Sequence, residues 1–219
     1  MNIVAGCASE LPVAVLFDMA RYRYEVFVQR LGWPLQTQGR MELDQFDRRD
    51  TLYVVARNPR GEVVGTARLL PTHRPYLLAE VFPQLLGDMP APRSPRTWEL
   101  SRFAFLNLED NASAAPGAPQ GLQALDFLRI VMRIAAEAGA SDLVSVSPLG
   151  IERILRRGGI AFGRAAPPAR VGAQMLCACT IALPDPVVLR LRRTGGPARP
   201  VRAARRWARS SAKEDGVAH

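Results

Sequence analysis

The stretch Thr51-Leu-Tyr-Val-Val-Ala-Arg57, Asn58-Pro-Arg-Gly61, Glu62-Val-Val-Gly-Thr-Ala-Arg-Leu-Leu70 decides the fold of this sequence. Its first and last segments are rich in β-branched and apolar residues, and the four residues between them are turn formers. We therefore predict two strands, 51–57 and 62–70, joined as a β-hairpin. A hairpin alone is marginally stable in water, so further strands and helices must cover it.

The segments around this hairpin predict a sheet covered by helices. Apolar residues recur at spacings of three and four over 12–31, which is typical of a helix, whereas 34–50 is predicted to be a charged loop. Further helices are expected at 76–86, 122–138 and 149–157, and further strands at 97–105, 142–147, 160–164 and 174–183. This order predicts an α/β protein: a three-layer α/β/α sandwich with a mostly antiparallel mixed sheet, splayed between two central strands.

The chain of 219 residues suits one domain, predicted as 1–183, followed by an Arg/Pro-rich extension, 184–219. The net charge of +9 lies mostly in that extension, where nine basic and three acidic side chains leave +6. Glycine and proline interrupt the extension, and it lacks an apolar helical face. We therefore expect it to be flexible at least beyond residue 195.

Cysteines and histidines are too few for a disulfide framework or a zinc site. Cys177 and Cys179 alternate within a predicted buried strand, so buried free thiols are expected for them rather than a metal or redox pair. Besides Cys7, the remaining candidates are His73 and His219, which make no zinc ligand set. The first residues lack the basic and long apolar regions of a secretory leader, because Glu10 and Asp18 interrupt them, so no leader is expected. No stretch approaches the roughly 20 apolar residues of a membrane span. We expect a cytoplasmic protein without a metal.

Charged residues gather beside aromatic ones in the first half of the chain. Arg23 and Phe27 are four residues apart and share one helical face, and Arg68 lies within an apolar strand. Glu99 and Arg102 lie in another strand, among aromatic residues. A charge buried in a sheet is costly unless it is paired. Ion pairing alone explains each of these residues about as well as a ligand site does.

As a set, these residues resemble the acyl-homoserine lactone (autoinducer) synthases. The motifs that carry the resemblance are Arg23-Tyr-Glu-Val-Phe27, Trp33, Asp44-Gln-Phe-Asp47, Ala67-Arg-Leu-Leu-Pro-Thr72, Phe82 and Trp98-Glu-Leu-Ser-Arg-Phe103. The first motif is one residue shorter than the family's Arg-Tyr-x-x-Val-Phe. The likeness covers residues 10–183 and is strongest over 22–105.

The resemblance implies an N-acetyltransferase-like fold and an acyltransferase with two substrates. These are S-adenosylmethionine and an acyl thioester, carried by acyl carrier protein or, in some members, by coenzyme A. The amine of S-adenosylmethionine takes the acyl group. The methionyl carboxylate then displaces methylthioadenosine and closes the lactone, a quorum-sensing signal. S-adenosylmethionine is thus a substrate, and no cofactor is expected.

The same resemblance implies roles for individual residues. Glu99 is the expected base, acting directly or through water on an amine with a pKa of about 8. The other catalytic residues are expected to be Ser101 and four charged residues that pair and order the loop: Arg102, Arg68, Asp47 and Asp44. The S-adenosylmethionine pocket is expected at Arg23, Phe27, Trp33, Phe82 and Phe103, with aromatic faces toward the sulfonium.

Two further surfaces are expected from the second half of the chain. The acyl pocket is placed at Leu100, Phe105, Leu125, Leu128, Met132, Ser147 and Leu149. Arg153, Arg156 and Arg157 lie at positions i, i+3 and i+4 of one predicted helix and form one basic face. This face is either a docking site for the acidic carrier protein or a solvated surface.

Two other functions compete with this interpretation. An N-acetyltransferase using acetyl-CoA would carry Arg/Gln-x-x-Gly-x-Gly/Ala before its long helix. Gly121 fits that signature, but Ala118 and Gln123 do not, so the signature is absent. The non-enzymatic alternative is nucleic-acid or anionic-membrane binding through the Arg-rich extension and Trp207. The breaks at Gly195 and Pro200 argue against a binding helix there.

The residues of 97–105 predict an irregular strand. Glu99 and Arg102 are three apart, so a regular strand would point them to opposite faces, although the resemblance puts both in one cleft. The apolar positions also change parity between Leu100 and Phe103. One extra residue would correct both phases. We therefore predict a β-bulge between Glu99 and Phe103.

Overall fold

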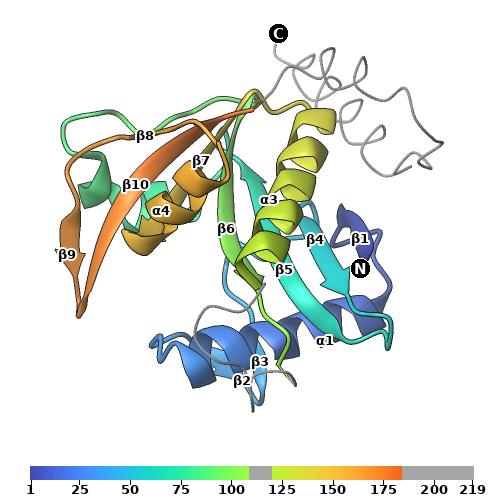
Figure 1. The fold of residues 1–219 in the computed structure, drawn as a ribbon. Coiled ribbons are helices and arrows are strands. Elements are labelled where there is room, and N and C mark those ends of the chain that lie inside the picture. Colours follow the sequence, from blue (N-terminus) through green and yellow to red (C-terminus); the bar gives the residue numbers. More distant parts are fainter. Residues whose placement is uncertain (109–119, 184–219) are drawn as a thin grey trace, which may run out of the picture.

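A computed structural model describes residues 1–108 and 120–183 (Figure 1). The helices are α1 (Val13–Arg23), the π-helix η1 (Tyr24–Arg30), α2 (Leu77–Val81), the 3-10 helix η2 (Pro83–Leu86), α3 (Gln120–Glu137) and α4 (Gly150–Arg157). The strands are β1 (Asn2–Cys7), β2 (Thr37–Gln38), β3 (Met41–Glu42), β4 (Leu52–Arg57), β5 (Val63–Pro71), β6 (Thr97–Phe105), β7 (Asp142–Pro148), β8 (Phe162–Arg164), β9 (Ala169–Val171) and β10 (Gln174–Ala182). The predicted extension, 184–219, lies outside the described residues, and with it the proposed nucleic-acid arm.

The main sheet has the order β1-β4-β5-β6-β7-β10-β8, with β9 paired to β10. Neighbouring strands are antiparallel except β6 and β7, which are parallel. That pair is short, joining Thr97–Glu99 to Asp142–Val144, and beyond it the two strands separate. Figure 1 shows the sheet opening between β6 and β7. The splayed mixed sheet predicted from the sequence is confirmed.

Both faces of the sheet are covered, which explains why the sequence of β4 is a continuous apolar run. Leu52 and Val54 join the main core cluster with α3, whereas Tyr53 and Val55 pack with Val15 and Met19 of α1. Alternate side chains point to opposite faces, so a strand buried on both sides has no polar positions. The three-layer α/β/α sandwich is therefore confirmed.

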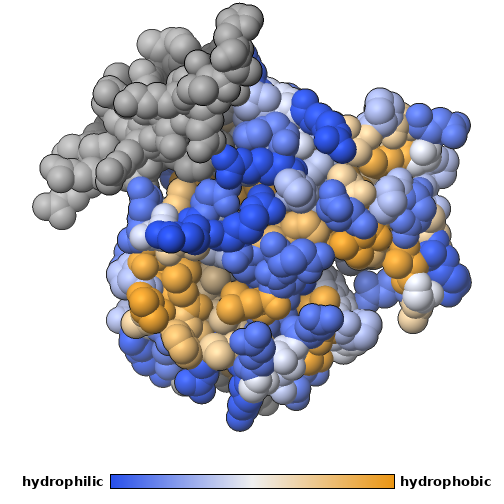
Figure 2. All heavy atoms as spheres, turned by 180° about the vertical axis from the view of Figure 1, so that it is seen from behind, coloured by the Kyte–Doolittle hydropathy of each residue, from blue (hydrophilic) through white to orange (hydrophobic). Residues whose placement is uncertain are grey.

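The surface and the helices add two observations. On the side seen in Figure 2, apolar areas are separated by hydrophilic residues. No helix in the described part of the chain is both long and apolar enough to cross a bilayer.

Several elements of the structure differ from the sequence-based prediction. The edge strand β1 and the short strands β2, β3 and β9 were not predicted, and β2 and β3 lie within the expected loop. The helix expected over 12–31 is α-helical only to Arg23 and continues as the π-helix η1. Strands of two or three residues carry too few positions for an alternating pattern, and a π-helix retains helical spacing in the sequence.

The predicted bulge in β6 is present. Arg68 pairs with Ser101 and Thr66 pairs with Ala104, so β6 contains one residue more than β5 between these pairs. Arg102 lies at this irregularity with φ 50°, the one positive value outside glycine in the described residues. The phase shift brings Glu99, Ser101 and Arg102 to one face of β6.

Candidate functional site

A buried ion-pair network joins the helix α1 to the loop that precedes β4. The Arg23 guanidinium donates to Asp47 through two nitrogens, at 2.7 and 2.9 Å, and its Nε donates to Glu42 at 2.6 Å. Arg23 is fully buried. The Tyr53 hydroxyl donates to Asp47 at 2.7 Å. Such charge-assisted bidentate contacts fix the loop over the sheet.

The network continues into β5 and β6. Arg68 Nη1 lies 2.5 Å from Asp44 and 3.3 Å from Asp47, and its Nε donates to Ser101 Oγ at 3.0 Å. The Arg102 Nη2 lies 2.9 Å from both Glu42 and Asp44. Three arginines therefore face three carboxylates, and the cluster is neutral overall when every carboxylate is ionised.

The electrostatics of the network follow from burial opposed by pairing. Burial alone would raise the pKa of Asp47, but Arg23 and Arg68 outweigh it and hold that pKa well below its ordinary value. Burial likewise works against Glu42, whose pKa is lowered by Arg23 and Arg102. Both carboxyl groups are therefore ionised at neutral pH because their partners are present.

Glu99 has a different environment on the same face of β6. Its carboxylate is fully buried and accepts the backbone N–H groups of Leu77 and Leu78, at 2.9 and 2.6 Å, where α2 begins. Burial raises its pKa to about 7, although these two N–H groups act in the opposite direction. A carboxyl group titrating near neutral pH is suited to accept a proton.

A cavity of about 310 Å³ opens where β6 and β7 separate. Its walls are largely apolar, and a few polar groups interrupt them. The apolar lining includes Phe27, Leu31, Trp33, Leu100, Phe103, Leu128, Ile151 and Ile154; the polar lining is Ser101, Arg102, Ser145 and Ser147. This composition is typical of a pocket for a mostly apolar ligand with a few oriented polar atoms.

Aromatic rings and the network meet at one end of this cavity. The Phe27 and Trp33 rings are stacked with centroids 5.0 Å apart, and the Arg102 guanidinium lies 5.8 Å from the Phe27 ring centroid. The positive φ of Arg102 aims its side chain from the bulge toward Glu42 and Asp44. The ion-pair network therefore lies next to the stacked rings of Phe27 and Trp33, which form an aromatic wall of the cavity.

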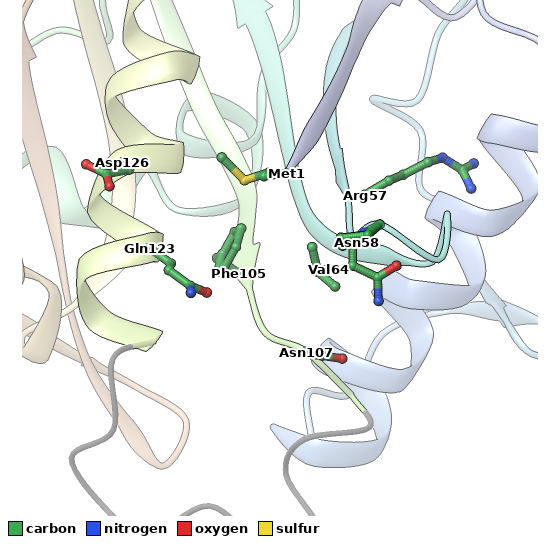
Figure 3. A pocket seen from close by; sticks show the side chains of 9 residues that line it. Met1, Arg57, Asn58, Val64, Phe105, Asn107, Gln123 and Asp126 are labelled. Carbon is green, nitrogen blue, oxygen red and sulfur yellow. The ribbon is translucent and has the colours of Figure 1, made fainter.

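The structure brings together some of the predicted residues and separates others. Arg23 lies inside the network and does not line the cavity, and Phe82 packs against another cluster, with Leu78 and Leu85. Of the expected acyl pocket, Leu100, Leu128 and Ser147 line the cavity. Leu125 is buried, Met132 is buried in the main core, Leu149 is exposed, and Phe105 lines a different pocket (Figure 3).

The predicted basic face lies beside the cavity. Arg153, Arg156 and Arg157 are exposed on α4, whose residue Ile154 reaches the cavity lining. The Arg156 guanidinium also lies 5.5 Å from the centroid of the Phe162 ring. The basic face therefore belongs to a helix that also forms part of the cavity wall.

Sequence reasoning missed Glu42, which is fully buried and bridges Arg23 and Arg102. Its position two residues before Asp44 was the available signal, since alternate residues of an extended segment share a face. Tyr53 was missed as well, because a tyrosine in a strand usually only packs. Cys179 and Ser145 also line the cavity, and the three cysteines are free and buried.

The comparisons with known proteins agree with this geometry. The sequence profile described as autoinducer synthase matches residues 9–189. The chain belongs to the autoinducer synthase family. An acyl-homoserine-lactone synthase of Acinetobacter nosocomialis is 42% identical over 83% of this chain and 99% of its own length. The prediction of an acyltransferase that makes acyl-homoserine lactones is thereby confirmed.

Two solved structures extend the comparison to ligands. TofI, in a ternary complex with an inhibitor and MTA, is 40% identical with a TM-score of 0.73, over 88% of this chain and 97% of that one. BjaI, a CoA-dependent acyl-homoserine lactone synthase solved with SAM and isopentyl-CoA, is 26% identical with a TM-score of 0.76, over 95% and 98%. Within residues 1–108 and 120–183 no group of three metal-ligating side chains is placed to hold an ion.

Proposed function

We propose that the cavity between β6 and β7 is the active site of an acyl-homoserine-lactone synthase, with the bulge at Arg102 at the point of reaction. The observation that carries this proposal is the meeting, at one bulge, of an apolar cavity, an aromatic wall and a buried ion network. An extended acyl chain fits the apolar part. A charged, polar nucleophile fits the other end.

S-adenosylmethionine is assigned to the end bounded by Phe27, Trp33 and Arg102. Aromatic faces attract a sulfonium cation, and the Arg102 guanidinium, which lines the cavity, is a hydrogen-bond donor for the methionyl carboxylate. The solved complexes of TofI with MTA and of BjaI with SAM support a site for this substrate in the family fold. In this assignment Arg23 acts as a positioning residue, because it is buried behind the wall.

The acyl chain is assigned to the part lined by Leu100, Phe103 and Leu128. The ammonium first gives one proton to a base, and the neutral amine nitrogen attacks the thioester carbonyl carbon. The C–S bond breaks, and the thiolate leaves with the second proton that the nitrogen loses. A methionyl carboxylate oxygen then attacks the γ-carbon. The bond from that carbon to sulfur breaks, its electron pair stays on sulfur, and methylthioadenosine leaves as a neutral thioether.

Glu99 is the proposed base for the first step. Its carboxylate does not line the cavity, so the proton reaches it through a water or through the hydroxyl of Ser101, which does. The bulge also changes the backbone pairing beside the cavity, and an N–H freed from the ladder there is suited to hold the oxyanion.

The purified protein, incubated with S-adenosylmethionine and an acyl thioester, should release an acyl-homoserine lactone and methylthioadenosine in equal amounts. Mass spectrometry of the product, and of spent medium from an expressing host, measures both. Acylated S-adenosylmethionine without lactone would contradict the second step. Consumption of the thioester without any acylated product would contradict the proposed function.

We assign the acyl donor to acyl carrier protein rather than coenzyme A. The basic face of Arg153, Arg156 and Arg157 lies next to the cavity and fits an acidic protein. Replacing Arg153 and Arg157 by Glu should raise the KM for acyl carrier protein about tenfold, a loss of about 1.4 kcal/mol. The KM for S-adenosylmethionine should not change. Raising the salt concentration should likewise raise the KM of the wild-type enzyme for acyl carrier protein.

The control for this prediction carries the same charge change elsewhere. Arg21 and Arg133 are exposed on α1 and α3, and their double replacement by Glu should leave both KM values unaltered. Equal kinetics with acyl-CoA and with the carrier protein, insensitive to charge and salt, would assign the donor to coenzyme A instead.

The proposal includes a cytoplasmic location and no cofactor. Three free, buried thiols suit a reducing compartment. Substrate turnover after exhaustive dialysis against a chelator tests the absence of a metal requirement.

A further inference from the structure

Three packed aromatic rings, Phe103, Phe127 and Phe105, adjoin the apolar cavity. Phe103 lines the cavity, and its ring is stacked on Phe127 of α3 with centroids 5.5 Å apart and planes at 21°. The ring of Phe105 also packs against Phe127, with centroids 5.5 Å apart and planes tilted by 44°. Phe127 is fully buried and contacts both rings. The rings therefore form a continuous wall between β6 and α3.

A second pocket lies beyond this wall. It has a volume of about 420 Å³ and is lined by Phe105 and Val64, among others. Figure 3 shows the Phe105 ring between Gln123 of α3 and Val64 of β5. The first turns of α3 border both spaces, since Ala124 and Leu128 line the cavity whereas Gln123 and Asp126 line this pocket.

The wall has no room to move toward β5. A Cβ atom added to Gly65 would lie 2.8 Å from Phe105 Cδ2 and 3.2 Å from Phe127 Cε1, so both rings rest against the strand backbone. A close-packed ring stack of this kind is displaced only at a cost in strain. Glycine at position 65 is what allows the stack to lie so near the sheet.

We propose that the stack of Phe103, Phe127 and Phe105 sets the longest acyl chain that the enzyme accepts, by separating the cavity from the second pocket. This inference rests on the proposed function, which puts the acyl chain in the cavity. A chain that reaches Phe103 meets packed rings, so additional methylenes find no free volume. The pocket beyond the rings contains Arg57 and Asp126, whose desolvation would also disfavour an apolar tail.

Replacing Phe127 by Leu should join the two spaces and lengthen the accepted chain. With a series of acyl donors, kcat/KM for the first chain longer than the preferred one should rise about tenfold relative to the preferred chain. One methylene in a hydrophobic pocket is worth at least this much. Phe103→Leu removes the ring on the cavity side and should shift the profile in the same direction, which keeps the test usable if Phe127→Leu does not fold.

Ile134→Ala is the matched control. Ile134 is buried in the same core, two turns further along α3, and lines neither space. It should lower the melting temperature while leaving the chain-length profile unchanged. A shift as large as that of Phe127→Leu would assign the effect to a loosened core and overturn the partition.

Leu128→Phe separates this inference from the function on which it rests. It fills the cavity itself and should move the preference toward shorter chains. If Leu128→Phe shortens the preferred chain but folded Phe127→Leu and Phe103→Leu keep the wild-type profile, the partition is wrong and the acyl site stands. If none of the three variants changes the profile, the chain does not lie in this cavity, and both proposals fail.

Discussion

Replacing Glu99 by Gln is expected to lower kcat/KM for lactone formation by about two to four orders of magnitude, the range of general acid–base catalysis. Burial raises the pKa of Glu99 to about 7, so the carboxylate that accepts a proton becomes populated as the pH rises through that value. The wild-type kcat/KM should therefore rise with pH. Deprotonation of the substrate amine, with a pKa of about 8, adds a second rise of kcat/KM with pH, and only this second rise should remain in the variant.

Glu80→Gln is the control for Glu99→Gln, because it makes the same change at an exposed position of α2. It should alter neither the rate nor the pH profile. Gln at position 99 keeps one oxygen for the α2 backbone, so a melting curve must show that Glu99→Gln folds. Near wild-type turnover in that folded variant would limit Glu99 to anchoring the N–H groups of Leu77 and Leu78.

The sequence was informative where a pattern repeats over many residues. The hairpin of β4 and β5, the helix α3 and the strand β10 each contain enough alternating or helical positions to be predicted. The bulge in β6 was also predictable, since Glu99 and Arg102 could share a face only if the strand changed phase. In these cases the pattern of residues within one segment is enough to predict the structure of that segment.

Contacts between distant segments were not predictable in the same way. Glu42 bridges Arg23 and Arg102 because the loop folds back over the sheet, and its spacing to Asp44, which indicates a shared face, does not indicate these partners. Likewise, Phe105 was expected in the acyl pocket as part of the apolar run from Leu100 to Phe105, but it packs against Phe127 and lines the second pocket instead. Such placements depend on tertiary packing.

Replacing Arg23 by Met is expected to destabilise the fold by about 3–5 kcal/mol, the usual cost of leaving buried carboxylates without their cation. The guanidinium is fully buried and holds both Asp47 and Glu42. Urea unfolding at neutral pH measures the loss. Arg40→Met is the control, because Arg40 forms an exposed pair with Glu25, and solvent screens such pairs so that they contribute little to stability.

The dependence of this loss on pH distinguishes electrostatics from lost packing. Arg23 holds the pKa values of Asp47 and Glu42 below their ordinary range, so its stabilisation is complete above the unfolded pKa values of about 4 and is lost as the pH falls through the lower folded ones. The difference in unfolding free energy between wild type and Arg23→Met should therefore shrink in acid. Adding Asp47→Asn to Arg23→Met should recover part of the stability at neutral pH, because one unpaired charge is removed. A loss that stays constant from pH 7 to acid, and that Asp47→Asn only deepens, would show that Arg23 stabilises the fold by packing rather than as the cation of the network.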